Sequence, residues 1–555
     1  MSKVKRKWDT LRTEYEERMK DAIPLRRRGK EIDAADTVQL LEAVIRAGDK
    51  VNLEGNNQKQ ADFLAECLSK VDISKINDLH MVQSAAPLPV FLELFEKGIA
   101  SKLDFAYAGP MGGKVAEFIN EGKLKLGAIH TYLELFARYF IDLTPRVSMV
   151  CAYQADREGN LYTGFNTEDT PVVVEAAKFR QGIVIAQANE IVDKLPRVDI
   201  PGDWVDFVVE SPKPFYVEPL FTRDPAAITD SQILMAMMAL KGIYKEYGIQ
   251  RLNHGIGFYT AAIELLLPTY GEELGLKGKI CNHFALNPHP TLIPAIESGW
   301  VDSIHSFGGE LGMADYCAAR SDVFFIGPDG TMRSNRAYSQ TAGHYAIDMF
   351  IGGTLQIDKY GNSSAATATR VAGFGGAPNM GCDAKGRRHA TPAWLKCGEE
   401  FGQQEEYIGT MPRGKRLVVQ MAETFLEKMQ PAYVDELDAV KLQKNAGLDM
   451  PPIMVYSDDV THIISEEGIA FLHKCRGLEE RMNAIRGVAG YTEIGLQANP
   501  KITKDLRERG IIQTPEDLGI DRGRANRSLL AAKNVKELVE WSDGLYNPPA
   551  RFRNW

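Results

Sequence analysis

The chain of 555 residues has no long hydrophobic run and no apolar leader. Its longest obvious apolar run, residues 233–240, is far shorter than the ~18 residues that a transmembrane helix needs. The first residues, MSKVKRKWDTLRTEYEERMK, carry many charges and lack the apolar centre of a secretory signal. These absences predict a cytoplasmic protein with no membrane span.

Cysteine motifs are missing as well. The seven cysteines are odd in number and none forms a Cys-x-x-Cys pair, so neither a disulfide framework nor a structural zinc site is indicated. Cys281, His283 and His289 lie close together in the sequence and raise the possibility of a bound metal. No second cysteine pair and no pair of histidines on one helix face accompanies them, and we therefore expect no metal site.

No large excess of charge of one sign is present. The net charge is −9, with 44% hydrophobic and 25% charged residues, which is typical of a soluble globular protein. An acidic balance argues against general nucleic-acid binding. The length exceeds what one core supports and predicts about two to four domains.

Two short patterns recur at nearly the same distance. A short strand, a glycine turn and an apolar helix occur around Gly55 and again around Gly255, 200 residues later. The pattern DREGN at residues 156–160 matches DKYGN at residues 358–362, with glycines 202 positions apart. Two unrelated patterns at almost one offset indicate an internal duplication.

Strand-like and helix-like runs alternate in both halves, which is typical of a parallel sheet with crossover helices. We expect strands at residues 50–53, 103–107, 147–153 and 182–186, and again at 279–284, 323–326, 355–357 and 416–420. Beyond these, the sequence predicts a strand at 453–456, helices at 466–475 and 479–486, and a capped helix start at 514–517.

The predicted fold class is therefore α/β, with two tandem duplicated open parallel-sheet domains. We assign residues 1–35 to a basic helical lead, 36–225 to the first domain and 226–430 to the second. Residues 431–555 form a C-terminal extension that completes and wraps the second domain. The seam falls in a proline- and aspartate-rich run at about residues 212–230.

Residues 370–381, RVAGFGGAPNMG, contain four glycines and a proline and must form a loop. Glycines let successive N–H groups approach one point, which suits a phosphate, an oxyanion or a polarised thioester carbonyl. An ordinary surface turn is the alternative. A second stretch, AGPMGGK at 108–114, lacks the spacing of a nucleotide loop, and we expect a helix-entry turn there.

Two facing halves would bring the Gly255 turn and the Gly375 loop to one cleft, which suits acyl transfer because amide donors stabilise the charge on a carbonyl oxygen. No serine elbow or nucleophile–base pair is present. The expected catalytic residues are Gly375 and Gly376 as oxyanion donors, with Asn282 and His283. The expected thioester and arm contacts are Asn253, His254, Gly255, Gly257, Phe374, Ala377, Asn56 and Asn57. Candidates for the substrate carboxylate are Arg370, Arg336, Arg387, Arg388 and His344.

The segments LNHGIGF, AGHYAIDMFIGGTLQIDKYGN and AGFGGA resemble the second half of class I coenzyme A transferases. AGDKVNLEGNNQKQADFL and QADREGNLYTG resemble the companion half. More closely, GNNQKQADFL, GAIHTYLELFARYFIDL, NHGIGFYTAAIELLLPTYGE, NPHPTLIPAIESGW and GFGGAPNMG together resemble the alpha subunits of bacterial malonate decarboxylases, over nearly the whole chain.

The resemblance implies a transferase that exchanges acetyl for malonyl on a carrier-protein thioester, consuming malonate and releasing acetate. The implied partners are an acyl carrier protein subunit and the decarboxylase beta and gamma subunits. The implied cofactor is a phosphoribosyl-dephospho-coenzyme A arm held by the carrier and not by this chain, with coenzyme A able to bind in its place.

One departure from the resemblance matters. Class I transferases carry a covalent glutamate in a Ser-Glu-Asn-Gly motif, whereas this sequence has Cys281, Asn282, His283 and Phe284 at the corresponding stretch. An amide is not a nucleophile of that kind. As in citrate lyase alpha subunits, we expect malonate to attack the thioester directly, through a mixed anhydride in a ternary complex. Glu264, Glu272, Glu273 and Glu297 are the possible substitute carboxylates.

Three alternatives stay open at this point. The chain could be a transferase that uses free coenzyme A, a dinucleotide-binding oxidoreductase, or a non-catalytic scaffold subunit. Against the oxidoreductase, neither glycine turn completes G-x-G-x-x-G before a helix.

Overall fold

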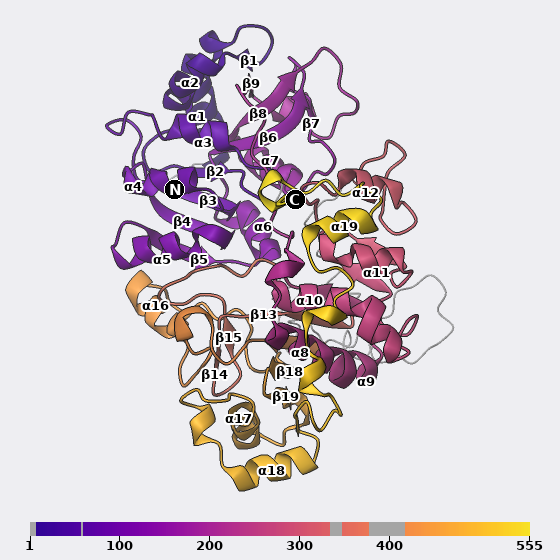
Figure 1. Cartoon of the computed structure of the whole chain (residues 1–555). Coiled ribbons are helices and arrows are strands. Elements are labelled where there is room, and N and C mark those ends of the chain that lie inside the picture. Colours follow the sequence, from indigo (N-terminus) through magenta and orange to yellow (C-terminus); the bar gives the residue numbers. More distant parts are fainter. Residues whose placement is uncertain (1–6, 57–58, 333–346, 377–416) are drawn as a thin grey trace, which may run out of the picture.

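The computed structural model describes residues 7–56, 59–332, 347–376 and 417–555 (Figure 1). Within these ranges, no helix is both long and apolar enough to cross a membrane. The chain builds two large sheets, one from each half, which lie side by side in Figure 1.

The first sheet is parallel except for one short strand. Its order is β1 (Glu31–Ile32), β9 (Phe207–Glu210), β8 (Ile183–Ile191), β6 (Val147–Ala155), β2 (Lys50–Leu53), β3 (Leu79–Ala85), β4 (Ala100–Tyr107) and β5 (Lys125–Ile129), with β7 (Leu161–Tyr162) antiparallel to β6. The central strands are buried along most of their length, as parallel strands covered on both faces must be.

Amphipathic helices cover both faces of this sheet. α1 (Lys7–Ala22), α2 (Thr37–Val44), α3 (Asp62–Leu68), α4 (Pro89–Glu96) and α5 (Gly112–Asn120) share one core cluster. α6 (Tyr132–Ile141) and α7 (Thr170–Phe179) pack into the other. Thr131 caps α6 by accepting the N–H of Glu134, which fixes where the helix begins at the end of β5.

The second sheet repeats the order of the first. It runs β12 (Ser303–His305), β11 (His283–Ala285), β10 (Arg251–His254), β13 (Met349–Gly353), β16 (Leu417–Met421) and β18 (His462–Ser465), all parallel. This matches β4, β3, β2, β6, β8 and β9 strand for strand. β19 (Gly468–Phe471) and β20 (Ile512–Gln513) then add an antiparallel edge. The predicted fold class and duplication are confirmed.

Helices again lie on both faces. One core cluster holds α8 (Asp230–Ala239), α10 (Phe258–Leu266), α11 (Ile293–Glu297), α12 (Ala314–Ala319) and α19 (Val535–Trp541). The other holds α17 (Leu478–Arg486) and α18 (Pro500–Glu508). α9 (Lys245–Tyr247), α16 (Asp438–Ala446) and a small sheet, β15 (Ser363–Ser364), β14 (Gln356–Asp358) and β17 (Tyr433–Val434), complete this half.

The two copies share hydrogen bonds as well as strand order. Asn52 in β2 donates from Nδ2 to the carbonyl of Val82 in β3, at 2.7 Å. Asn253 in β10 donates in the same way to Ala285 in β11. Each asparagine thus ties a central strand to its neighbour from inside the sheet.

The DREGN and DKYGN turns are also equivalent. In the first, Asp156 Oδ1 accepts the N–H of residues 158 and 160. In the second, Asp358 Oδ1 accepts the N–H of residues 360 and 362. The glycines between them, Gly159 and Gly361, have φ of +91° and +93°, a conformation that favours glycine.

Several predicted elements of the second domain and the C-terminal extension are wrong. Residues 466–475 form not a helix but β19 followed by a 3-10 turn (Leu472–Lys474), because β18 offers a pairing partner that local periodicity does not reveal. The predicted strands at 323–326 and 453–456 reduce to single bridges at Phe324 and Val455. Residues 514–519 make a turn in which Thr514 and Asp517 exchange capping hydrogen bonds without a helix.

The C-terminal tail lies over the seam between the halves, where Figure 1 places the end of the chain. The fully buried Tyr546 contacts Thr222 through its hydroxyl, at 3.1 Å. The N–H of Asn547 donates to Gly312, whose φ of +83° and contact with Asn547 leave no room for a side chain.

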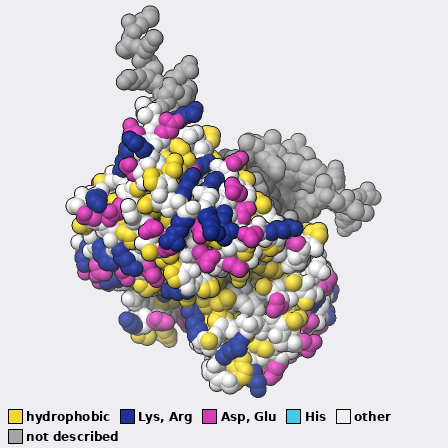
Figure 2. All heavy atoms as spheres, turned by 90° about the horizontal axis from the view of Figure 1, so that it is seen from above, with side chains coloured by type: hydrophobic (Ala, Val, Ile, Leu, Met, Phe, Trp, Pro, Cys, Tyr) yellow, Lys and Arg dark blue, Asp and Glu magenta, His cyan; other side chains and the backbone are white. Residues whose placement is uncertain are grey.

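Figure 2 shows the face seen from above, where Lys and Arg side chains are interspersed with Asp and Glu. Charges of both signs alternate on this face, so it presents no broad field of one sign.

We predict that Asn52→Ala and Asn253→Ala each lower the free energy of unfolding by about 1–3 kcal/mol, because each leaves a buried carbonyl without its donor. Urea unfolding measures the loss. Asn445→Ala, at an exposed position, is the matched control and changes stability by less than about 0.5 kcal/mol. If Asn253→Ala unfolds like the unmodified protein but binds a thioester poorly, its side chain belongs to the substrate site and not to the sheet.

Candidate active site

The carboxyl edges of the two sheets meet at one contact. Glu168, in the loop between β7 and α7, is buried and accepts the N–H of Gly309 at 3.3 Å. Gly309 follows β12, so this hydrogen bond joins the carboxyl edge of one sheet to that of the other. Glu168 has φ of +48°, a strained conformation for a residue with a side chain. Strain at the meeting point of two carboxyl edges is typical of a functional site.

On the first sheet, Glu54 organises the turn after β2. Its carboxylate accepts hydrogen bonds from Asn56 Nδ2, Thr170 Oγ1 and the N–H of Cys151. Burial raises the pKa of Glu54. Asn56, an expected arm contact, is fully buried, and its Oδ1 accepts the N–H of Lys59. The side chain of Asn56 therefore stabilises the turn through internal hydrogen bonds.

The glycine-rich loop belongs to the second half but docks on the first sheet. The N–H groups of Phe374 and Gly375 both donate to Ala106 in β4, at 2.8 and 3.0 Å. Ala108 donates to Ala372, and the carbonyl of Gly375 accepts the N–H of Tyr132. The loop thus lies across the carboxyl ends of β4 and β5.

This docking corrects one expectation. The N–H of Gly375 is already bound to a carbonyl, so it is not a free oxyanion donor in this conformation. The N–H of Gly376 has no such bond to a described residue. Gly373 has φ of +94°, and a side chain there would meet Ala106, so the loop approaches β4 closely only because that residue is glycine.

Asn282 and His283 lie at the wrong end of the second sheet for catalysis. His283 pairs with Arg251 at the amino end of β10, whereas the Gly255 turn follows the carboxyl end. Asn282 donates to Asp302, and His283 contacts Ser303. The expectation is wrong because the strand predicted at 279–284 starts only at His283.

The side chains of Asn253 and His254 form hydrogen bonds inside the second half. The side chain of Asn253 binds Ala285, and His254 Nδ1 contacts Glu264 at 2.8 Å while its Nε2 contacts Tyr244. Both side chains are buried, which contradicts direct contact with a thioester. The N–H of Gly255 likewise donates a hydrogen bond within the sheet, to the carbonyl of Ile351.

The proposed substitute carboxylates are occupied elsewhere. Burial alone would raise the pKa of Glu264, but His289 and His254 lower it to about 2. Thr291 and both histidines bind its oxygens. The other three form ion pairs or hydrogen bonds away from the junction: Glu272 with Lys277, Glu273 with Arg524, and Glu297 with Tyr316 and Arg320.

Gly257 opens α10 at the junction. A side chain there would meet no atom of the described residues within 4 Å, so they leave open space in front of this turn. Among the described residues, the N–H groups of Gly257 and Phe258 have no acceptor. The start of α10 therefore presents free donors and the positive end of a helix dipole.

Sequence reasoning missed the segment that crosses these loops. Phe221 stacks on His289, with ring centroids 5.3 Å apart. Thr222 donates twice to Glu310. Arg223 lies over Phe258, 5.8 Å from the ring centroid. We call residues 220–223 the linker strap, because they touch in turn the loop after β11, the loop after β12 and the start of α10, which follows β10. The only sequence signal was an arginine in the proline-rich seam.

Arg223 also faces the first half. Burial raises the pKa of Tyr107, at the end of β4, while the charges of Arg223 and Arg370 act against that rise. Arg370 itself is exposed, at the start of the docked loop. The charges of both arginines thus act on one tyrosine hydroxyl at the junction.

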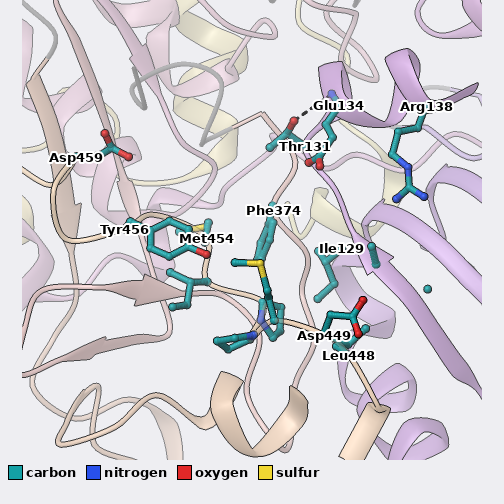
Figure 3. Close-up of a pocket in the computed structure, with 16 residues that line it drawn as sticks. Ile129, Thr131, Glu134, Arg138, Phe374, Leu448, Asp449, Met454, Tyr456 and Asp459 are labelled. Atoms are coloured by element: carbon teal, nitrogen blue, oxygen red, sulfur yellow. Dashed lines mark hydrogen bonds between the residues drawn. The ribbon is translucent and has the colours of Figure 1, made fainter. Parts of the chain in front are cut away.

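A groove of about 810 Å³ lies beside the docked loop (Figure 3). Phe374 points into it, between Ile129 of β5 and Met454 on the opposite wall. The lining mixes apolar side chains with polar ones, among them Thr131, Glu134, Arg138 and Asp449. Its size is sufficient for a flexible chain-like ligand.

The comparison with protein families covers almost the whole chain. The family described as "Malonate decarboxylase, alpha subunit, transporter" matches residues 7–555. The chain belongs to the malonate decarboxylase alpha subunit family. A relative from Malonomonas rubra, named acetyl-S-ACP:malonate ACP transferase, is 76% identical over 99% of both chains.

Solved structures of the malonate decarboxylase family share the fold. A chain of a Pseudomonas malonate decarboxylase hetero-tetramer in complex with malonate is 56% identical, with a TM-score of 0.91, over 99% of this chain and 100% of that one. A citrate lyase alpha subunit from Streptococcus mutans is 14% identical, with a TM-score of 0.58, over 88% and 86%. An acyl-CoA transferase from Escherichia coli O157:H7 is 14% identical, with a TM-score of 0.51, over 80% and 88%. The last two show the shared fold alone.

The remaining expected residues, Asn57, Ala377, Arg336, Arg387, Arg388 and His344, lie outside the described residues. Of the other expected residues, Phe374, Gly376, Gly257 and Arg370 lie at or beside the junction of this malonate decarboxylase alpha subunit. Glycine motifs in the sequence predicted the turns at Gly257 and Gly376, whereas no local sequence motif predicted the linker strap.

Glu310 gives this site a testable pH dependence. Burial raises the pKa of Glu310 to about 7 from a usual value of 4.5. Between these values the folded state binds more protons than the unfolded state, so stability falls as pH rises. We predict that Glu310→Gln is more stable than the unmodified protein by about 2 kcal/mol at pH 8, and that the difference shrinks towards pH 5.

Urea midpoints at four pH values measure this effect, with Glu508→Gln, on the exposed face of α18, as the control. A difference that does not change with pH would contradict the assignment to Glu310.

Proposed function

We propose that this chain exchanges acyl groups on a carrier-protein thioester, so that acetyl-S-carrier and malonate give malonyl-S-carrier and acetate. The observation that best supports this proposal is the 76% identity, over nearly the full length, to a relative that is named for this reaction. Family membership also removes support from the oxidoreductase and scaffold alternatives.

The chemistry needs no side-chain nucleophile. A malonate carboxylate oxygen attacks the acetyl carbonyl carbon, the carbon–sulfur bond breaks, and a mixed anhydride and a thiolate form. The thiolate then attacks the malonyl carbonyl and releases acetate, with no net proton transfer. Positioning in a ternary complex accounts for the rate, since proximity supplies roughly 7–11 kcal/mol.

The N–H of Gly376 is the oxyanion donor in this proposal, because that of Gly375 is bound to Ala106. One such donor contributes about 2.7–4 kcal/mol. The engagement of Glu264, Glu272, Glu273 and Glu297 in other contacts supports a route without a glutamyl intermediate.

The groove beside Phe374 is the proposed entry for the carrier's phosphoribosyl-dephospho-coenzyme A arm. The fit rests on its mixed polar and apolar lining, its volume and its position against the docked loop. Coenzyme A could enter by the same route. A relative assembles into a hetero-tetramer, and we assign the carrier, beta and gamma subunits as partners in a cytoplasmic complex.

We predict that the purified chain converts acetyl-carrier and labelled malonate into labelled malonyl-carrier, without a hydroxylamine-sensitive adduct on the protein. Gel analysis of the carrier and intact-mass analysis of the protein measure the two results. Greater activity with free acetyl-coenzyme A than with acetyl-carrier would instead favour the coenzyme A transferase alternative, and an acyl adduct on a glutamate would refute the ternary route.

A second prediction concerns the groove. Ala128→Trp, on its wall, raises the KM for acetyl-carrier by about 10-fold or more, because the indole fills space that the arm needs. Lys125→Trp lies on the same strand, exposed and outside the groove, and leaves this KM unchanged. Equal effects of both substitutions would show that the arm enters elsewhere.

A further inference from the structure

Arg223 is a half-buried arginine without a counter-ion among the described residues. Its Nη1 donates to the carbonyls of Leu220 and Thr222, at 2.7 and 2.8 Å, while Nε and Nη2 bind no described residue. Burial lowers the pKa of Arg223, which means that its environment disfavours the charge.

Several other arginines that are withdrawn from water are compensated by carboxylates or by backbone carbonyls. Arg18 pairs with Glu14 and Asp49, and Arg197 pairs with Asp199 and Asp329. Arg481 has no carboxylate, but it donates to three backbone carbonyls. Arg223 has neither arrangement, so the free edge of its guanidinium, Nε and Nη2, remains open to an anion.

The surroundings of Arg223 suit a carboxylate. Phe258 fixes one face of the guanidinium at the start of α10, where free N–H groups add positive potential. The charge of Arg223 also acts on Tyr107 of the first half, as does the charge of Arg370 in the docked loop of the second half.

The nearest acidic groups do not neutralise it. Glu218 accepts hydrogen bonds from Arg551 and Tyr216, and Glu310 accepts from Thr222.

We propose that Arg223 binds the malonate carboxylate that takes no part in acyl exchange. This inference rests on the proposed function. In the reaction above, one carboxylate attacks the thioester and the other must be held still. A fork of two parallel N–H groups matches that second carboxylate, which acetate lacks.

The assignment makes Arg223 a specificity residue. The entering dicarboxylate is held at both ends, whereas the departing acetate has no group for the arginine and is released more readily. The same site therefore distinguishes the substrate from the product by charge and not by size.

The test compares two exchange reactions of one protein in the assembled complex. In the first reaction, labelled malonate replaces the acetyl group on the carrier, and its second carboxylate is free to bind Arg223. In the second reaction, labelled acetate replaces the acetyl group, and acetate has no second carboxylate. For Arg223→Gln we expect kcat/KM for malonate to fall by about 10- to 100-fold, while acetate exchange stays within about 2-fold. Arg223→Lys keeps the charge but loses the fork, and we expect an intermediate loss for malonate only.

Arg507→Gln, which removes a surface ion pair with Asp517, is the matched control and leaves both exchanges unchanged. Equal losses in both exchanges for both Arg223 variants, or no loss for malonate, would overturn the inference. Failure of the unmodified protein to form malonyl-carrier at all would instead overturn the proposed function.

Discussion

The hydrogen bonds between the glycine-rich loop and the end of β4 are the constraint on which the junction depends. A segment that belongs to the second half donates two N–H groups to Ala106 of the first half and accepts one from Tyr132. Backbone bonds of this kind fix position to within tenths of an ångström, because neither partner has rotatable side-chain bonds. The open bend at Gly257 and the groove beside Phe374 are arranged around a loop that is itself held rigidly.

Duplication explains both what the halves share and how the site became asymmetric. Asn52 and Asn253 keep the same bond to a neighbouring strand, and the two aspartate turns keep the same hydrogen bonds. The loops after those strands differ. One copy closes its turn around a buried glutamate, Glu54, whereas the other leaves an open glycine bend in front of a helix. Conserved framework and divergent loops are how one fold acquires a single site from two copies.

Much of the framework could be predicted from the sequence, because buried parallel strands and glycine turns are local signals. β2 and β10 lie directly before the two repeated glycine turns, as the sequence repeat predicted. The predicted helix over residues 466–475 failed because its true partner, β18, is chosen by tertiary pairing. Asn282 was misplaced by a strand boundary a few residues in error, which moved it to the opposite edge of the sheet. Arg223 could not be found, since its importance arises from the lack of a counter-ion among the residues that the structure describes, and this property exists only in the folded chain.

The position of the C-terminal tail has a consequence for synthesis. Tyr546 packs on Thr222, in the middle of the linker strap, so a residue of the C-terminal region secures a segment that is made more than three hundred residues earlier. The first sheet can form while translation continues, because all its strands precede residue 211. The contact on the linker strap forms only after Tyr546 has been made. A polypeptide that stops short of Tyr546 therefore lacks the contact that holds the linker strap, although every strand of the first sheet is present.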